Sequence, residues 1–354
     1  MVIETSIPTI DEEMEKELLR ALREEMLVGG KSVELFEQEF ARFVGSQYAV
    51  AVNSGTDALF ITLRCMGITG KVITPPMSFV ATAESIVLGG ARPSFVDIDP
   101  NTWNIDVEKI EDAIDGETVA IMPVHLYGLP CNMKRIQEIA EDHNLFVIED
   151  CAQAHGAMFN GKKVGTIGDA GCYSFYSTKN MTVGGNGGII VTDDKQVADK
   201  AKLLREHGGS NNAIYIGYNA RINTINAAFG RVQLKRLNEW VAKRQQIAEH
   251  YKKQLKDVKT QKGEGNVYHL FGIQTEQRDR LKDHLKSKGI FTGVHYPHSI
   301  AALKPYQEFA ESKTFSISDH HAKTCLSLPM HPQLSFNDVD VVCREIAAFK
   351  EANV

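Results

Sequence analysis

Short apolar segments alternate with amphipathic segments through the first two thirds of the chain, and this alternation most constrains the fold. The amphipathic segments Asp106–Ile114 and Met133–His143 are predicted to be helical. The predicted strands are Ala49–Val52, Lys71–Thr74, Ser94–Val96, Val119–Pro123, Leu145–Ile148, Gly171–Phe175 and Ile189–Thr192. Strands separated by helices indicate an α/β fold, with a mainly parallel sheet covered on both faces.

A long helix is predicted to lead out of this sheet, because apolar residues recur at helical spacing over Ile225–Tyr251. The elements expected beyond it are a strand over Val267–Ile273, a helix over Arg278–Lys288 ended by Gly289, and a last helix over Asp338–Ala352. At 354 residues with 43% hydrophobic content, the chain is long enough for two domains. We expect a large α/β domain over 1–240 and a smaller α+β domain over 241–354.

Three groups with complementary chemistry follow predicted strands. Lys179 lies between an apolar strand and the glycine-rich segment 184–188, where desolvation can leave a neutral, nucleophilic amine. Asp150 follows another strand, and Ser54-Gly55-Thr56 follows the first. Open α/β sheets bind ligands at strand ends. Pyridoxal phosphate requires an amine for its aldehyde, a carboxylate for its pyridinium nitrogen and a cradle for its phosphate, so these groups together predict a site for that cofactor.

Each of these features also has an ordinary structural interpretation. A lysine near a loop is usually solvated, an aspartate at a strand end is routine, and Ser-Gly-Thr often only caps a helix. Gly184–Gly188 would equally suit a tight hairpin turn between Tyr173–Tyr176 and Ile189–Thr192. The order of the three groups, each after a predicted strand, favours the cofactor site.

Further segments extend the pattern over nearly the whole chain. They are Val28–Gly30, Phe36–Ala41, Ser54–Leu59, Pro76–Thr82, Phe95–Asp99, Pro123–Gly128, Glu149–Gly156, Tyr173–Lys179, Gly217–Arg221 and Leu326–Pro329. On these segments the chain resembles the DegT/DnrJ/EryC1/StrS family of sugar aminotransferases. The resemblance implies a fold-type I pyridoxal-phosphate transferase with a mainly parallel sheet and a smaller C-terminal domain.

The resemblance also implies roles for individual residues. Lys179 would form the Schiff base with pyridoxal phosphate and shuttle a proton, and Asp150 would contact the pyridine nitrogen. The other implied cofactor contacts are Gly55, Thr56 and Ser174 at the phosphate, Phe79 on the ring face, Gln153 near the phenolic oxygen, and Asn219 from a neighbouring subunit. Gln153 could instead bond within its own loop, and Phe79 could be an ordinary core side chain. The Asn219 contact implies a homodimer with shared active sites.

Three residues are weaker candidates for contacts with the substrate. His295 and Tyr296 match a part of the family that lies near the active-site entrance. Arg221 could pair with an anionic substrate group or form a structural salt bridge. His295 and His298 are three residues apart, but Pro297 argues against a helix that presents both to one metal, so no metal site is expected.

The activity implied by the resemblance is the transfer of an amino group from L-glutamate to a nucleotide-linked keto-sugar. It would proceed by a ping-pong mechanism in which the cofactor alternates with pyridoxamine phosphate. A keto-cyclitol is an alternative acceptor. Some relatives are sugar dehydratases with a histidine in place of the lysine, and Lys179 argues against that chemistry. Retention of Lys179 and Asp150 also argues against a noncatalytic, ligand-sensing regulator.

Composition narrows the partners and the compartment. A formal charge of -6 argues against a general nucleic-acid or membrane-surface binder. No apolar stretch is long enough to span a membrane, and the acidic start Asp11–Leu19 does not resemble a signal peptide. The six cysteines lack paired spacing, as is typical of reduced thiols. We therefore expect a cytoplasmic enzyme of small-molecule substrates without disulfides.

Overall fold

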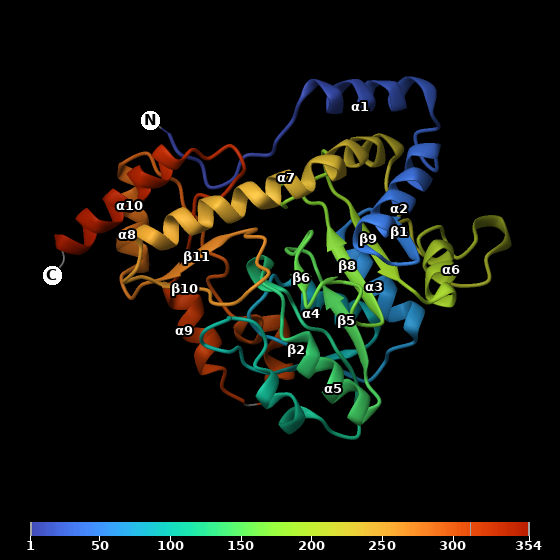
Figure 1. Ribbon diagram of the computed structural model, residues 1–354. Helices are drawn as coiled ribbons and strands as arrows, with labels where there is room; N and C mark the ends of the chain where they lie inside the picture. Colours follow the sequence, from blue (N-terminus) through green and yellow to red (C-terminus); the bar gives the residue numbers. More distant parts are fainter. Residues whose placement is uncertain (1, 312, 353–354) are drawn as a thin grey trace.

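The centre of the molecule is a seven-stranded sheet, seen in a computed structural model that describes residues 2–311 and 313–352 (Figure 1). The strand order is β1-β9-β8-β5-β4-β2-β3. Only β9 runs against its neighbours, pairing antiparallel with both β1 and β8. The other four neighbouring pairs of the sheet are parallel. The strands are β1 Tyr48–Val52, β2 Lys71–Thr74, β3 Arg92–Phe95, β4 Thr118–Ile121, β5 Phe146–Asp150, β8 Ala170–Ser174 and β9 Gly188–Thr192. The predicted, mainly parallel sheet is confirmed.

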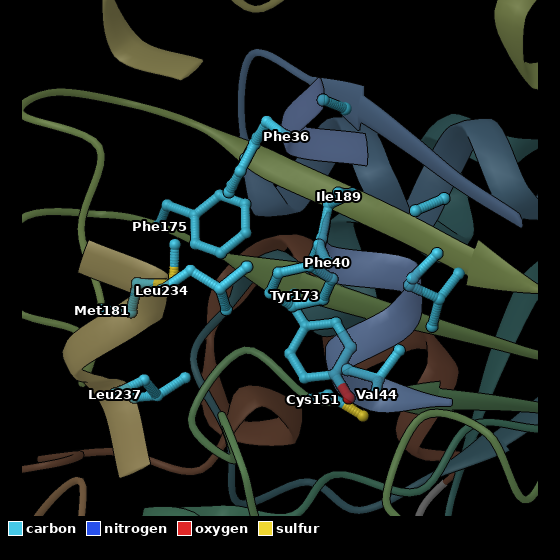
Figure 2. Close-up of a cluster of buried hydrophobic side chains, with 14 of the residues drawn as sticks. Phe36, Phe40, Val44, Cys151, Tyr173, Phe175, Met181, Ile189, Leu234 and Leu237 are labelled. Atoms are coloured by element: carbon cyan, nitrogen blue, oxygen red, sulfur yellow. The ribbon is translucent and has the colours of Figure 1, made fainter. Parts of the chain in front are cut away.

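Helices pack on both faces of this sheet. Because alternate side chains of a strand point to opposite faces, β1 places Ala51 in one apolar cluster and Val52 in another. Figure 2 shows the first cluster, in which Phe36 and Phe40 of α2 meet Phe175. The helices associated with the sheet are α2 Lys31–Val44, α3 Gly55–Met66, α4 Ala81–Gly89, α5 Met133–His143 and α6 Lys195–Leu204. Burial on both faces explains why the strands are continuous apolar runs in the sequence.

A long helix, α7 Thr224–Gln254, extends from the large sheet to the C-terminal part of the molecule, and α1 Glu12–Glu24 lies along it (Figure 1). The predicted long helix is therefore confirmed. The C-terminal part holds a second sheet of strand order β10-β11-β12, antiparallel throughout. Its elements are β10 Lys259–Thr260, β11 Phe271–Gln274, α8 Arg278–Ser287, α9 Ser316–Thr324, β12 Cys325–Leu328 and α10 Phe336–Glu351.

The two parts of the molecule are interleaved along the sequence. Near the N-terminus, Ile3 forms a parallel bridge with Ile290 and packs in the C-terminal core. In the other direction, Ile300 and Phe315 pack against Phe95 at the edge of the large sheet. Helix α7 also runs through residue 240 without a break. A division into 1–240 and 241–354 stays a proposal.

The prediction of a helix over residues 106–114 is wrong. The segment forms two short 3-10 helices, η1 Val107–Lys109 and η2 Glu111–Ala113. Its apolar residues Val107, Ile110 and Ala113 recur at every third position, which a 3-10 helix places on one side. Two further 3-10 helices precede α9, η5 Ile300–Ala302 and η6 Lys304–Ala310.

The connection between β8 and β9 is longer than a tight hairpin turn. The two strands pair as antiparallel neighbours, with Ser174 opposite Gly188. Residues 175–187, including Lys179, therefore form the whole connection between the strands. A small hairpin of β6 Met158–Phe159 and β7 Lys162–Lys163 precedes β8. The length of the connection leaves Lys179 free to enter a site at the strand ends.

The lengths of the helices and the state of the cysteines relate to two of the expectations from the sequence, the one on membrane spans and the one on disulfides. None of the helices within residues 2–311 and 313–352 combines the length and apolar character that crossing a bilayer demands. The six cysteines are free and buried. Burial raises the pKa of Cys65 to about 12, so this thiol stays protonated at neutral pH.

Candidate active site

A cavity of about 720 Å³ lies at the carboxyl ends of β1, β5 and β8. The loops that follow these strands form one side of it, and residues of the C-terminal part form the other. The sequence-predicted site residues that line it are Gly55, Thr56, Phe79, Asp150, Gln153, Ser174, Lys179, His295 and Tyr296. The structure thus brings together in one cavity residues that are far apart in the chain.

Lys179 lies in the connection after β8, where its N–H donates to the carbonyl of Tyr176 at 2.8 Å. Burial lowers the pKa of Lys179 to about 8, and the negative charge of Asp150 opposes that shift. At pH 7 about one amine in ten would then be neutral. Lys179 would therefore supply some neutral amine at a pH where an ordinary lysine is almost fully protonated.

Asp150 is the last residue of β5 and is buried. The Thr82 hydroxyl donates to its Oδ2 at 2.8 Å, and the Ala152 N–H donates to its Oδ1 at 3.1 Å. Burial raises the pKa of Asp150, against the effects of these two donors and of the Lys179 charge. A carboxylate that is costly to ionise gains stability from a nearby cation. As a hydrogen-bond acceptor with a negative charge, Asp150 fits the protonated ring nitrogen of pyridoxal phosphate.

Helix α3 directs its N-terminus at the cavity. Ser54 caps the helix by accepting from the N–H of Asp57 at 3.0 Å. The N–H groups of Gly55 and Thr56, in the first turn, have no acceptor within the helix. A Cβ atom on Gly55 would lie 2.6 Å from Cβ of Ser174, so glycine is needed for the helix to approach the end of β8. Such a helix start, next to a serine hydroxyl, fits a phosphate group.

Gln153 joins the two sides of the cavity. Its Oε1 accepts from the N–H of Tyr127 at 2.7 Å, and its Nε2 donates to Oη of Tyr296 at 3.0 Å. The alternative of a bond within its own loop is therefore not what the structure shows. Phe79 is 54% exposed and its ring centroid lies 5.8 Å from that of Tyr296, so it is not an ordinary core side chain. Both residues are placed to face a ligand.

Asn219 and Arg221 do not line the cavity of their own chain. Nη1 of Arg221 donates to Oε1 of Glu206 at 3.1 Å, which is the structural salt bridge that the sequence left open. Asn219 forms an antiparallel bridge with the same Glu206. The role implied for Asn219 in a neighbouring subunit stays a prediction.

Sequence reasoning missed several residues that line the cavity, namely Glu4–Ser6, His269, Leu270 and Gly293. Residues 4–6 reach it because Ile3 pairs with Ile290 and the Thr5 carbonyl accepts from Met330 N–H at 3.0 Å. His269 is buried, and its Nδ1 has no hydrogen-bond partner in the part of the chain that the structure describes. A local motif does not encode these placements, because they depend on contacts between distant segments.

One buried group next to Asp150 has the composition of a metal site, namely His125, Glu149 and Cys151. Nδ1 of His125 accepts from the N–H of Cys131, so the ring proton is on Nε2 and is donated to Glu149 Oε2 at 3.0 Å. The Glu149 carboxylate also accepts from three backbone N–H groups in residues 165–168. Protein hydrogen bonds therefore already use the histidine and the carboxylate.

Comparison with known proteins agrees with this geometry. Residues 8–347 match the model of the DegT/DnrJ/EryC1/StrS aminotransferase family. The chain is 37% identical to a "Pleiotropic regulatory protein" of Geobacillus stearothermophilus, over 97% of this chain and 98% of the relative. It is 36% identical to a dTDP-3-amino-3,6-dideoxy-alpha-D-galactopyranose transaminase of Aneurinibacillus thermoaerophilus, over 94% of each chain.

Solved structures place the chain in the same group. The crystal structure of DesV from S. venezuelae, in complex with a ketimine intermediate, superposes with a TM-score of 0.92 at 33% sequence identity. The match covers 95% of this chain and 94% of that one. It confirms the predicted fold class and the resemblance on which the residue roles depend.

Proposed function

Because the chain belongs to the DegT/DnrJ/EryC1/StrS aminotransferase family, we propose that it uses pyridoxal phosphate to aminate a keto-sugar carried on a nucleotide. The observation that carries this proposal is the placement of the half-buried Lys179 and the buried Asp150 on one cavity at the strand ends. The relative from Aneurinibacillus thermoaerophilus, named as a transaminase of a dTDP-linked amino sugar, supports the substrate class.

Lys179 has two tasks in this proposal. Bound pyridoxal phosphate would supply an aldehyde for its amine and an aromatic ring that draws electrons from the reacting carbon. The lowered pKa of Lys179, about 8, lets Nζ react as a neutral amine and later accept a proton from the substrate carbon and return it. A solvated lysine with its ordinary pKa would remain protonated and could do neither.

Other residues of the cavity hold the cofactor in place. Asp150 would pair with the ring nitrogen and keep it protonated. The first-turn N–H groups of Gly55 and Thr56, with the Ser174 hydroxyl, would bind the phosphate. Phe79 would lie on the ring face, where its exposed aromatic surface would be covered. These contacts orient one ring between a fixed amine and a fixed carboxylate.

We propose L-glutamate as the amino donor and a ping-pong mechanism. A single cavity of about 720 Å³ serves the lysine, the carboxylate and the phosphate cradle. The donor and the keto-sugar must then react at the same Lys179, so the first product has to leave before the second substrate reacts.

We also propose a homodimer with shared active sites. Asn219 does not line the cavity of its own chain, so a phosphate contact would have to be made to another subunit. The adjoining segment 205–218 exposes apolar side chains, with Ile214 at 69% and Ile216 at 89% exposure. A second copy of the chain would cover these side chains. A cytoplasmic location stays part of the proposal.

A noncatalytic regulator is the second candidate, because a relative 37% identical over 97% of this chain is named a regulatory protein. Lys179 and Asp150 favour catalysis, since sensing alone needs neither an amine of lowered pKa nor a buried carboxylate. Lys179 also argues against the dehydratase alternative, in which histidine would replace it.

The deciding experiment loads the protein with pyridoxal phosphate and glutamate and then screens acceptors. Glutamate should shift the cofactor absorption, and a nucleotide-linked keto-sugar should restore the first band. Restoration by a keto-cyclitol alone would transfer the assignment to that substrate class. A protein that binds the cofactor but responds to no amino donor would favour the regulator. Lys179→Ala, treated in the same way, gives the background change in cofactor absorption.

A further inference from the structure

The orientation of the Gln153 amide is fixed by a backbone group. The N–H of Tyr127 can only donate, so the atom 2.7 Å from it must be the carbonyl oxygen Oε1. The amide nitrogen Nε2 therefore points the other way, to Oη of Tyr296 at 3.0 Å. In the reverse orientation two donors would face each other across 2.7 Å. Gln153 thus donates to Tyr296, and the phenolic oxygen is the acceptor.

This direction leaves the hydroxyl proton of Tyr296 for another partner. Within residues 2–311 and 313–352, Oη of Tyr296 has a hydrogen bond with Gln153 and no acceptor for its own proton. Tyr296 and Gln153 both line the cavity. Burial raises the pKa of Tyr296, and the nearby Asp150 charge adds to the effect, so the hydroxyl stays protonated. Tyr296 is therefore an O–H donor available to a ligand.

We propose that Tyr296 donates this hydrogen bond to an uncharged oxygen of the keto-sugar and that Gln153 is its positioning residue. The proposal rests on the proposed function. The Asp150 charge acts on the Tyr296 hydroxyl, and the same charge would repel a carboxylate of glutamate there. Carboxylates are better bound by charged donors than by a phenol. A sugar carbonyl, hydroxyl or ring oxygen fits the donor without that repulsion.

Two substitutions test the donor by different means. Tyr296→Phe removes the hydroxyl and keeps the ring beside Phe79. Gln153→Glu keeps an acceptor for the Tyr127 N–H but replaces the Nε2 donor by an oxygen, which would capture the Tyr296 proton. Tyr306→Phe is the matched control, because Tyr306 lies on η6 outside the cavity lining. Tyr296→Phe tests the loss of the hydroxyl, and Gln153→Glu tests the loss of its proton to a neighbouring acceptor.

The assay uses the cofactor-loaded enzyme and the keto-sugar that restores its absorption band. Each site variant should raise KM for that sugar by about 3- to 10-fold, the usual range for one uncharged hydrogen bond. In Tyr296→Phe the loss in the glutamate half-reaction should be smaller than the loss with the sugar, and every parameter of Tyr306→Phe should stay within about 2-fold. The affinity for the amino-sugar product, measured by calorimetry, should fall by the same factor as KM rises. This measurement does not depend on turnover.

A double variant and an analogue series decide the mechanism. If both single changes act on the same proton, Tyr296→Phe should cost little more in the Gln153→Glu background. A deoxy analogue that lacks the contacted oxygen should be discriminated against by wild type and not by Tyr296→Phe. Three outcomes would each overturn the inference and leave the proposed function intact. They are additive effects in the double variant, an unchanged KM for the keto-sugar, and an equal loss in the glutamate half-reaction. A wild-type enzyme that aminates no sugar would overturn both.

Discussion

The two sides of the cavity are built in different ways. On one side, Asp150 and Gly55 stand directly at the ends of β5 and β1, with Lys179 in the connection after β8. On the other side, the lining groups come from distant parts of the chain and are brought together by long-range contacts; they include His269, Tyr296 and residues 4–6. We call these the strand-end side and the assembled side.

The contrast assigns a different task to each side. The strand-end side carries the groups for chemistry, and the sheet fixes their spacing. Apart from Glu4, the assembled side carries neutral and aromatic groups. Long-range contacts such as the hydrogen bond from the Tyr127 hydroxyl to the His295 carbonyl hold it in place. Substitutions on the first side should affect cofactor attachment and turnover, whereas those on the second should affect recognition of the sugar.

Lys179→Ala is expected to have the largest effect. Removing the amine should abolish turnover and leave no cofactor that borohydride can fix to the protein. Mass spectrometry after reduction measures the attachment. The matched control is Lys163→Ala, because burial lowers the pKa of Lys163 as well, although it lies outside the cavity lining. Covalent attachment that persists in Lys179→Ala would assign the role to another lysine.

Asp150→Asn should have the next largest effect. The change keeps the size of the side chain and removes the charge that would stabilise a protonated ring nitrogen, so kcat should fall by about 100-fold or more. Covalent attachment should survive, since Lys179 is intact. Steady-state rates and borohydride trapping measure the two separately. Exposed Asp112→Asn serves as the control, and a rate near wild type for Asp150→Asn would remove the carboxylate from the chemistry.

Much of the strand-end side could be predicted from the sequence, because there the link between sequence and position is short. The predicted strand Leu145–Ile148 became β5, and Asp150 ends that strand. The same holds for β1 and the helix start at Gly55. When a group lies within a few residues of a strand end, the sheet decides where it lies.

The assembled side could be predicted only in part. His295 and Tyr296 were found through the family resemblance, and Glu4–Ser6 and His269 were not found at all. Their positions depend on partners such as Ile290 for Ile3, which lie almost a full chain length away. The failed helix over residues 106–114 has a related cause, since a repeat of three apolar positions also suits 3-10 geometry.

Arg244→Leu tests the assembled side. Nη1 of Arg244, which is buried, donates to the carbonyls of Tyr268 at 3.1 Å, His269 at 3.4 Å and Met330 at 2.9 Å. Without it these carbonyls lose a donor, and the free energy of unfolding should fall by about 2–4 kcal/mol. KM for the keto-sugar should rise several-fold while borohydride trapping at Lys179 stays complete.

The control for this variant is Arg23→Leu on the exposed side of α1. Chemical denaturation measures the stability, and steady-state kinetics measures KM. A loss of cofactor attachment in folded Arg244→Leu would show that the two sides are not separable in function, which contradicts the comparison.

The smallest predicted effect is a shift in the pH dependence of cofactor attachment. It depends on the interaction between the charges of Lys179 and Asp150 on the strand-end side. Burial lowers the pKa of Lys179 to about 8 while the Asp150 charge raises it. Neutral amine therefore accumulates as the pH rises, and the rate of cofactor attachment should increase with a midpoint near 8. In Asp150→Asn the opposing charge is absent, so the midpoint should move to lower pH.

Attachment rates measured from pH 6 to 10 give both midpoints. A wild-type midpoint at the ordinary lysine value of 10.5 would mean that Lys179 is solvated, and a midpoint unmoved by Asp150→Asn would mean that the two groups do not sense each other across the cavity.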